Sequence, residues 1–308
     1  MRTTTNPMRN LNNSFWHLAP ALAFPRMEQA EAMRTQFLPQ LSQMVKPAAV
    51  TRPAPGRRAM QSLAQRRQPP EWLLPFVHQR RPLTVDAAGV AHIHVLGVLD
   101  KRVTDVDSWF EVTDYDDLKE EMVLARDDAR VRAAAAEFDQ APGGSVMGND
   151  EIASLWASIQ AKKPTLSYTD TICASAAYNI ACGASLFYAS PSAIVGSIGT
   201  IMTWFSMAAA LENWGEQAHI VTPAASDLKA TFTPYREPTE TELEDVQRQI
   251  ENLNAAFLGR VRAMRGDVDD DSMRGQAFFQ ASEAASRNLI DAVASREQAY
   301  ADLLSLIG

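Results

Sequence analysis

The sequence has 308 residues, of which 46% are hydrophobic and 21% charged, and its formal net charge is −8. This is an ordinary globular composition with enough apolar material for a core, and it argues against a disordered or fibrous chain. The two cysteines, Cys173 and Cys182, are too few for a disulfide framework and lack metal-ligand spacing, so we expect reduced thiols.

The charge is unevenly distributed along the chain. Residues 1–81 hold 12 Lys and Arg against 3 Asp and Glu, a net of +9, so the remaining residues carry −8 − 9 = −17. Residues 1–82 are also rich in proline and predict a partly flexible N-terminal extension with one helix, over 27–44. Its arginine pairs are not interleaved with aromatic residues, which favours a solvated arm over nucleic-acid binding.

The pattern from Leu83 onward predicts alternating strands and helices. Strands are expected over 90–98 (with a bend at Gly97), 131–138, 165–168, 186–189 and 218–221. Helices are expected over 115–128, 150–161, 205–214 and 239–265, the last with a Thr239–Glu242 capping box. This order indicates an α/β domain over 83–292 with a mostly parallel sheet, followed by a short C-terminal tail, 293–308.

No charged residue occurs between Asp170 and Glu212. Proline, glycine and asparagine interrupt this span, so it predicts a buried sheet centre and no membrane helix. His17 and Pro20 likewise interrupt the apolar run near the N-terminus, which argues against a secretory signal.

Three stretches suggest chemistry. Ser175 stands among small residues where a strand meets a helix, a position suited to a nucleophile or to an incidental serine of a buried unit. Gly143 and Gly144 follow a strand, where free backbone N–H groups can hold an oxyanion or the glycines simply make a tight turn. Lys229 lies in an apolar setting that favours a neutral amine base, although an exposed charge is the plainer reading.

The histidines offer weaker alternatives. His92 and His94 share one strand face, but no third metal ligand is in view, which favours a structural or exposed role. His219 falls within a predicted strand, so a Ser-His-Asp triad is not indicated.

Four segments in this order resemble the signal peptide peptidase A family of Ser-Lys peptidases, relatives of ClpP and crotonase. They are Ala141-Pro142-Gly143-Gly144-Ser145, Ala174-Ser175-Ala176-Ala177-Tyr178, Gly196-Ser197-Ile198-Gly199, and Lys229 with Thr233-Pro234-Tyr235-Arg236. The segment 279–291 adds a further match, so the resemblance spans residues 83–292. The chain departs from the family at Ala141, where a serine is usual, and at Ala176 and Ala177, where glycines are usual.

The resemblance implies a ClpP/crotonase-like fold of repeated β-β-α units and a serine endopeptidase. Ser175 would be the nucleophile and Lys229 the general base. Gly143, Gly144 and Ala176 would form the oxyanion and substrate site, and Ser197 would orient the lysine amine. No metal or organic cofactor is implied.

Within the family, the chain is most similar to the phage-encoded capsid proteases. That branch implies a ring- or dome-shaped homo-oligomer that cleaves scaffold or portal proteins, with no nucleic acid or membrane partner. The expected location is the bacterial host cytoplasm, at the procapsid, without secretion. The alternatives are a host-type signal peptide peptidase, a CoA-ester enzyme of the crotonase type, and a catalytically silent structural ring.

Overall fold

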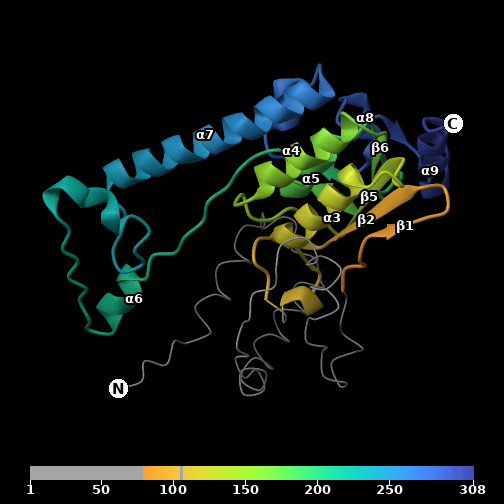
Figure 1. Cartoon of the computed structure of the whole chain (residues 1–308). Helices are drawn as coiled ribbons and strands as arrows, with labels where there is room; N and C mark the ends of the chain where they lie inside the picture. The colour runs from red at the N-terminus through yellow and green to blue at the C-terminus, as the bar shows by residue number, and fades with distance from the viewer. Residues whose placement is uncertain (1–78, 105–106) are drawn as a thin grey trace, which may run out of the picture.

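The computed structural model describes residues 79–104 and 107–308 (Figure 1). The predicted N-terminal helix over 27–44 and most of the arginine pairs lie outside these residues. None of the helices in the described ranges combines the length and hydrophobicity needed to cross a bilayer.

A six-stranded sheet forms the centre of the domain, in the order β1-β2-β5-β6-β8-β11. Its strands are β1 (Thr84–Val85), β2 (Val90–Leu96), β5 (Ala133–Asp139), β6 (Thr165–Thr169), β8 (Leu186–Ala189) and β11 (Ala292–Val293). β1 pairs with β2 antiparallel, and every other pair in the sheet is parallel. The predicted α/β class with a mostly parallel sheet is therefore confirmed.

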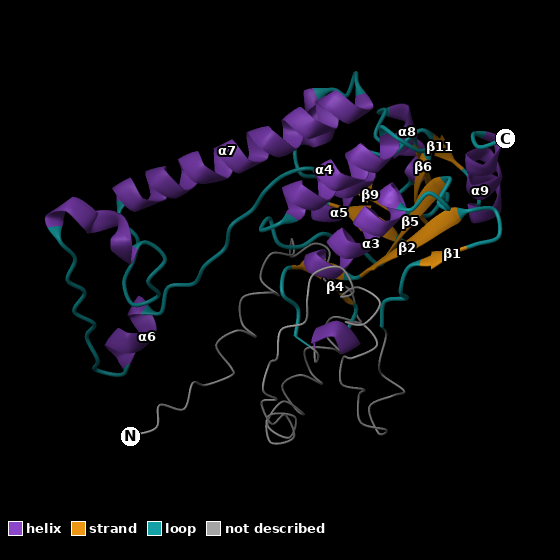
Figure 2. Cartoon of the chain, in the orientation of Figure 1, coloured by secondary structure: helices purple, strands orange, loops and turns teal. Residues whose placement is uncertain are grey.

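Three helices cover one face of this sheet (Figure 2). They are α3 (Tyr115–Asp127), α4 (Asn149–Gln160) and α5 (Ala176–Ala181). Alternate residues of each strand point toward them, so that Ala134, Ala136 and Phe138 of β5 pack in one cluster with Leu118 and Trp156. The small alanines of β5 let the helices approach the sheet closely.

The opposite face is covered in part by α9 (Arg296–Ser305). Its Ala299 and Leu303 are fully buried against Leu166 and Tyr168 of β6. Part of the stretch expected as a C-terminal tail is thus a helix that packs on the sheet. The domain boundaries drawn from the sequence stay a prediction.

Short strands continue from the main sheet into a second layer. Gly97, with φ of +68°, separates β2 from β3 (Val98–Asp100), which pairs with β4 (Val112–Asp114). β7 (Ile172–Ala174) lies in a three-stranded sheet with β9 (Ile194–Gly196) and β10 (Ala277–Phe278). The order β6-β7-α5 is one β-β-α unit of the expected kind, although no strand was expected over 172–174.

The segment 201–239, which we call the arm, stands away from the sheet (Figure 1). It contains α6 (Ala208–Asn213) and the 3-10 helix η5 (Ala224–Ala230). The prediction of a strand over 218–221 is wrong: the segment is an exposed loop. Its β-branched Ile220 and Val221 favour a strand, but no strand in the described ranges pairs with it.

A helix of 26 residues, α7 (Glu240–Arg265), connects the arm to the body (Figure 1). At 1.5 Å per residue it is about 39 Å long. The predicted Thr239–Glu242 capping box begins it, which confirms that expectation. Arg236 adds two hydrogen bonds to the Glu242 carboxylate, at 2.7 and 2.8 Å, so the end of the arm is fixed to the first turn of α7.

The remaining described helices are short. They are the 3-10 helices η4 (Asp107–Trp109) and η6 (Asp270–Met273) and the α-helix α8 (Ala281–Ser286).

Candidate active site

Ser175 occupies the tight turn between β7 and α5. Its backbone has φ of +51° and ψ of −122°, a combination that costs a residue with a side chain of the order of 1–3 kcal/mol. The turn is held because the Ser175 N–H donates to the Gly196 carbonyl at 2.9 Å. Strain of this kind at a strand-helix junction is typical of a serine presented as a nucleophile.

Gly143 lies directly against Ser175. A Cβ added to Gly143 would stand 2.7 Å from the Ser175 Cβ, 3.1 Å from its Oγ and 3.2 Å from the Ala176 nitrogen. Gly143 also has φ of +122°, which side chains rarely permit. Glycine is therefore required here both by the backbone conformation and by the space beside the hydroxyl.

Two backbone N–H groups are candidates for an oxyanion hole. The Leu99 N–H donates to Gly143 and its carbonyl accepts from Ser145, both at 2.9 Å, so the N–H of the intervening Gly144 points away from β3. Ala176 is the first residue of α5, where an N–H has no acceptor within the helix. The structure thus places Gly143 against Ser175 and Ala176, with Gly144 next along the chain; that their N–H groups form an oxyanion site stays a prediction.

A cavity of about 700 Å³ opens beside Ser175. Ser197 contributes to its wall, with φ of +50° and an N–H that donates to the Gln276 carbonyl at 2.7 Å. Apolar side chains from Ile198, Leu258 and Met273 share the lining with charged groups from α7 and η6. A peptide chain lying here would bring a carbonyl to the serine hydroxyl.

Lys229 is not beside Ser175 in the single chain. It belongs to η5 in the arm, which Figure 1 shows at a distance from α5, and it is exposed to solvent. The apolar environment expected from Leu228, Ala230 and Phe232 is absent, because this part of the arm has no core of its own: Leu228 and Phe232 are themselves exposed. Within one chain, the structure separates the two residues predicted to act together.

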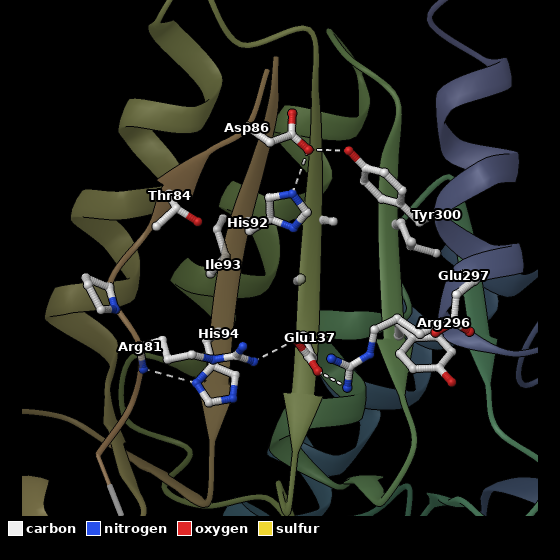
Figure 3. A pocket seen from close by; sticks show the side chains of 15 residues that line it. Arg81, Thr84, Asp86, His92, Ile93, His94, Glu137, Arg296, Glu297 and Tyr300 are labelled. Atoms are coloured by element: carbon white, nitrogen blue, oxygen red, sulfur yellow. Dashed lines mark hydrogen bonds and ion pairs between the residues drawn. The ribbon is translucent and has the colours of Figure 1, made fainter. Parts of the chain in front are cut away.

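The other face of the sheet carries a second cavity, of about 690 Å³ (Figure 3). His92 and His94 both point into it from β2. The His92 ring bonds the Asp86 carboxylate at 2.9 Å, and His94 Nδ1 accepts the Arg81 N–H at 3.1 Å. In the described ranges no three His, Cys, Asp or Glu side chains are grouped to hold a metal ion. His219 lies in an exposed loop of the arm, where a strand was expected.

The cysteines are poor alternative nucleophiles. Both Cys173 and Cys182 are fully buried, and burial raises the pKa of each thiol, that of Cys182 to about 12. The reactive thiolate is therefore disfavoured, and the serine is the accessible group.

Sequence reasoning missed the polar groups that hold the two glycines in place. Gln140 has φ of +49°, and its N–H donates to Thr171 Oγ1 at 2.7 Å. Beyond the glycines, the Ser145 carbonyl accepts the Tyr115 hydroxyl, and that hydroxyl in turn meets Asn149. An asparagine at the start of an apolar helix, as in α4, was the only available signal, and it equally suits an ordinary helix start.

Known proteins resemble this chain over part of its length. Capsid assembly protease C of Escherichia phage lambda is 26% identical over 66% of this chain and 46% of that protein. A putative signal peptide peptidase of Enterococcus faecium is 25% identical over 58% of this chain and 52% of that protein. The chain thus spans about half the length of these curated relatives.

Among solved structures, a ClpP1 variant from Listeria monocytogenes aligns with a TM-score of 0.43 and 12% identity, over 68% of this chain and 93% of that one. The resemblance to the signal peptide peptidases and phage capsid proteases is confirmed by the curated relatives. Residues 157–307 match the model described as peptidase family S49.

Proposed function

We propose that this protein is a serine endopeptidase in which Ser175 is the nucleophile and Lys229 the general base. The observation that carries the proposal is the strained Ser175 turn packed against Gly143, with the Ala176 N–H at its side. A hydroxyl presented in this way, beside N–H groups that can stabilise developing negative charge, suits attack on a peptide carbonyl.

In the first step, Ser175 Oγ forms a bond to the carbonyl carbon while its proton passes to the Lys229 amine. The N–H groups of Gly144 and Ala176 donate to the carbonyl oxygen as it becomes negative. The C–N bond then breaks, and the lysine returns the proton to the leaving amine. Water, deprotonated by the same amine, hydrolyses the acyl-enzyme and regenerates Ser175. In this scheme Ser197, in the wall of the same cavity, orients the amine.

The base would come from a second copy of the chain. Lys229 is carried on the arm, away from Ser175, so the dyad needs a neighbour whose arm reaches the cavity. Docking would also remove water from the lysine, and desolvation favours the neutral amine that a base requires.

The surface of the arm supports this arrangement. Eight of its apolar or aromatic side chains are at least two-fifths exposed, which is unusual for a segment that stays in water. They are Ile201 (49%), Met202 (40%), Phe205 (59%), Met207 (40%), Trp214 (65%), Val221 (92%), Phe232 (45%) and Tyr235 (51%). Contact with a neighbouring copy would bury them.

The relatives suggest a substrate class. The similarity to a capsid assembly protease favours a phage or prophage head protease that acts in the procapsid, inside the host cell, on scaffold or portal proteins. A signal peptide peptidase of the host type is the alternative that the Enterococcus faecium relative keeps open.

Mixing two inactive variants tests the dyad. Ser175→Ala keeps the base and lacks the nucleophile, whereas Lys229→Ala keeps the nucleophile and lacks the base. We expect neither alone to react with a fluorophosphonate probe, and we expect the Lys229→Ala chain, marked by a size tag, to become labelled when both are mixed. Lys162→Ala, at an exposed surface pair with Asp127, is the matched control and keeps wild-type labelling.

Each result has a distinct meaning. Labelling of the mixture supports a base given by a neighbouring copy. If the probe labels wild type but not the mixture, the base lies in the same chain or is another residue. If wild type is not labelled and cleaves none of the co-expressed scaffold-like and portal-like proteins, the endopeptidase proposal fails and a structural ring takes its place.

A further inference from the structure

A buried set of three polar side chains lies behind the proposed oxyanion hole. It consists of Tyr115 at the start of α3, Asn149 at the start of α4 and Asn179 within α5. Their exposed fractions are 1%, 5% and 3%. Polar groups buried this deeply are costly unless they are hydrogen-bonded, so their partners indicate what they hold in place.

The donor and the acceptor of each hydrogen bond to the Asn149 side chain can be assigned. The Tyr115 hydroxyl donates to the Ser145 carbonyl at 2.8 Å, so it must accept the proton offered by Asn149 Nδ2 at 3.1 Å. The second proton of Asn149 Nδ2 is donated to the Ala176 carbonyl at 2.9 Å. The Ala176 carbonyl can only accept, which fixes the orientation of the Asn149 amide, and Asn149 Oδ1 then accepts from Asn179 Nδ2 at 2.6 Å.

This connectivity joins the two halves of the proposed site. Ser145 follows Gly144 directly, and the Ala176 carbonyl belongs to the residue whose N–H is the second donor. The glycine turn and the first residue of α5 come from chain segments that are about thirty residues apart. The Asn149 amide bonds the Ala176 carbonyl directly and reaches Ser145 through the Tyr115 hydroxyl.

We propose that Asn149, acting with Tyr115, is a positioning residue that holds the N–H groups of Gly144 and Ala176 at a fixed separation. This inference rests on the proposed function, since it gives those two groups their role. An oxyanion hole stabilises charge only if its donors are already aimed when the charge develops. A displacement of the order of 1 Å can cost about a hundredfold in rate.

The chain offers a matched pair of variants to test this. Tyr115→Phe removes the hydroxyl that reaches Ser145. Tyr178→Phe removes an equally buried hydroxyl that donates to the Leu289 carbonyl, also at 2.8 Å, far along the chain from the glycine turn. Both variants lose the hydrogen bond that the hydroxyl donates to a carbonyl, and Tyr115→Phe also loses the one accepted from Asn149. Tyr115→Phe is therefore expected to lower the unfolding temperature at least as much as Tyr178→Phe, and it alone should alter the active site.

The first measurement is the saturation kinetics of Ser175 labelling by a fluorophosphonate, using full-length protein. We expect Tyr115→Phe to lower the maximal labelling rate by about tenfold or more, with the half-saturating concentration unchanged. Tyr178→Phe should stay within about twofold of wild type. Asn149→Asp, whose carboxylate cannot donate to Tyr115 or Ala176, should lose at least as much as Tyr115→Phe.

The second measurement is backbone hydrogen exchange of the same proteins, which does not require activity. Faster exchange at residues 143–146 in Tyr115→Phe, but not in Tyr178→Phe, would support the positioning role even if wild type is never labelled and the proposed function fails. If the two tyrosine variants behave alike in exchange, or label at the same maximal rate beside an active wild type, the inference is overturned.

Discussion

Arg265, the last residue of α7, forms a two-point ion pair with Asp291, which directly precedes β11. The guanidinium reaches the two carboxylate oxygens at 2.8 and 3.1 Å, and Asp291 also accepts the Phe187 N–H of β8 at 2.7 Å. The base of the long helix is therefore fixed to the edge of the main sheet, which sets the direction in which α7 carries the arm.

Breaking this pair should destabilise the domain. The Arg265 side chain is only 7% exposed, so Asp291→Asn leaves a nearly buried guanidinium without its charge partner. We expect a loss of about 2 kcal/mol in the free energy of unfolding, measured by urea denaturation. Asp271→Asn, in the exposed pair with Arg274, is the control and should change it by less than about 1 kcal/mol.

Gly143→Ala should abolish the chemistry without unfolding the protein. The new methyl group would collide with the Ser175 side chain and displace the glycine turn, so we expect probe labelling to fall by about a hundredfold or more. Gly259→Ala is the opposite case, since a Cβ there meets nothing within 4 Å on the exposed side of α7. That variant should label normally and gain about 1 kcal/mol of stability. Normal labelling of Gly143→Ala would contradict the proposed geometry.

The stability contributed by the Arg236–Glu242 ion pair, which joins the arm to α7, should depend on pH. Hydrogen bonds from the Arg236 guanidinium, then from the Thr239 N–H, lower the pKa of Glu242 from its ordinary 4.5 to about 2. A lowered pKa means that the stabilisation is complete above about pH 4.5 and is lost as the pH falls toward 2. The difference in unfolding free energy between wild type and Glu242→Gln should therefore be constant near neutrality and shrink below pH 4.5. A difference that persists unchanged at pH 3 would show that the carboxylate charge is not responsible.

Association of the chain should depend on the apolar surface of the arm. Replacing Phe205 and Trp214 with serine removes two of its most exposed aromatic groups, and we expect a lower molar mass by light scattering. Phe279→Ser, at a residue 62% exposed on the body, should leave the mass as it is in wild type. Equal masses for all three proteins would exclude this face of the arm from the contact.

Thiol chemistry should leave the active site unaffected. Burial raises the pKa of both thiols, so Cys173 and Cys182 should not react with maleimide in the folded protein and both should react in denaturant. Probe labelling of Ser175 after maleimide treatment should match that of untreated protein. Rapid modification of the folded chain would mean that α5 opens readily.

The sequence predicted the parts of the fold in which local pattern and tertiary environment agree. β2, β5 and β6 lie where strands were expected, and Thr239 with Glu242 marks the start of α7. β7 was missed because three residues are too short to show a period, and its partner β9 lies 22 residues further along the chain.

The candidate site, too, could be predicted only where the sequence carries a local signal. Ser175 and Gly143 could be proposed from the sequence because small residues at turns are a local signal of tight backbone geometry, whereas Ala176 came only from the family resemblance. The distance between Ser175 and Lys229 was not predictable, since it depends on where α7 carries the arm. The role of Asn149 was equally hidden, because its three hydrogen bonds join segments that are remote in sequence.

The length of α7 affects when Ser175 and Lys229 can come together. Ser175 on the body and Lys229 in the arm, beyond the far end of a helix of 26 residues, do not meet within one chain, so the proposed dyad cannot form while a chain is alone. Turnover would then rise steeply with protein concentration, and newly made, dilute chains would spare the other proteins around them. Activity would then be confined to places where many copies of the chain are gathered.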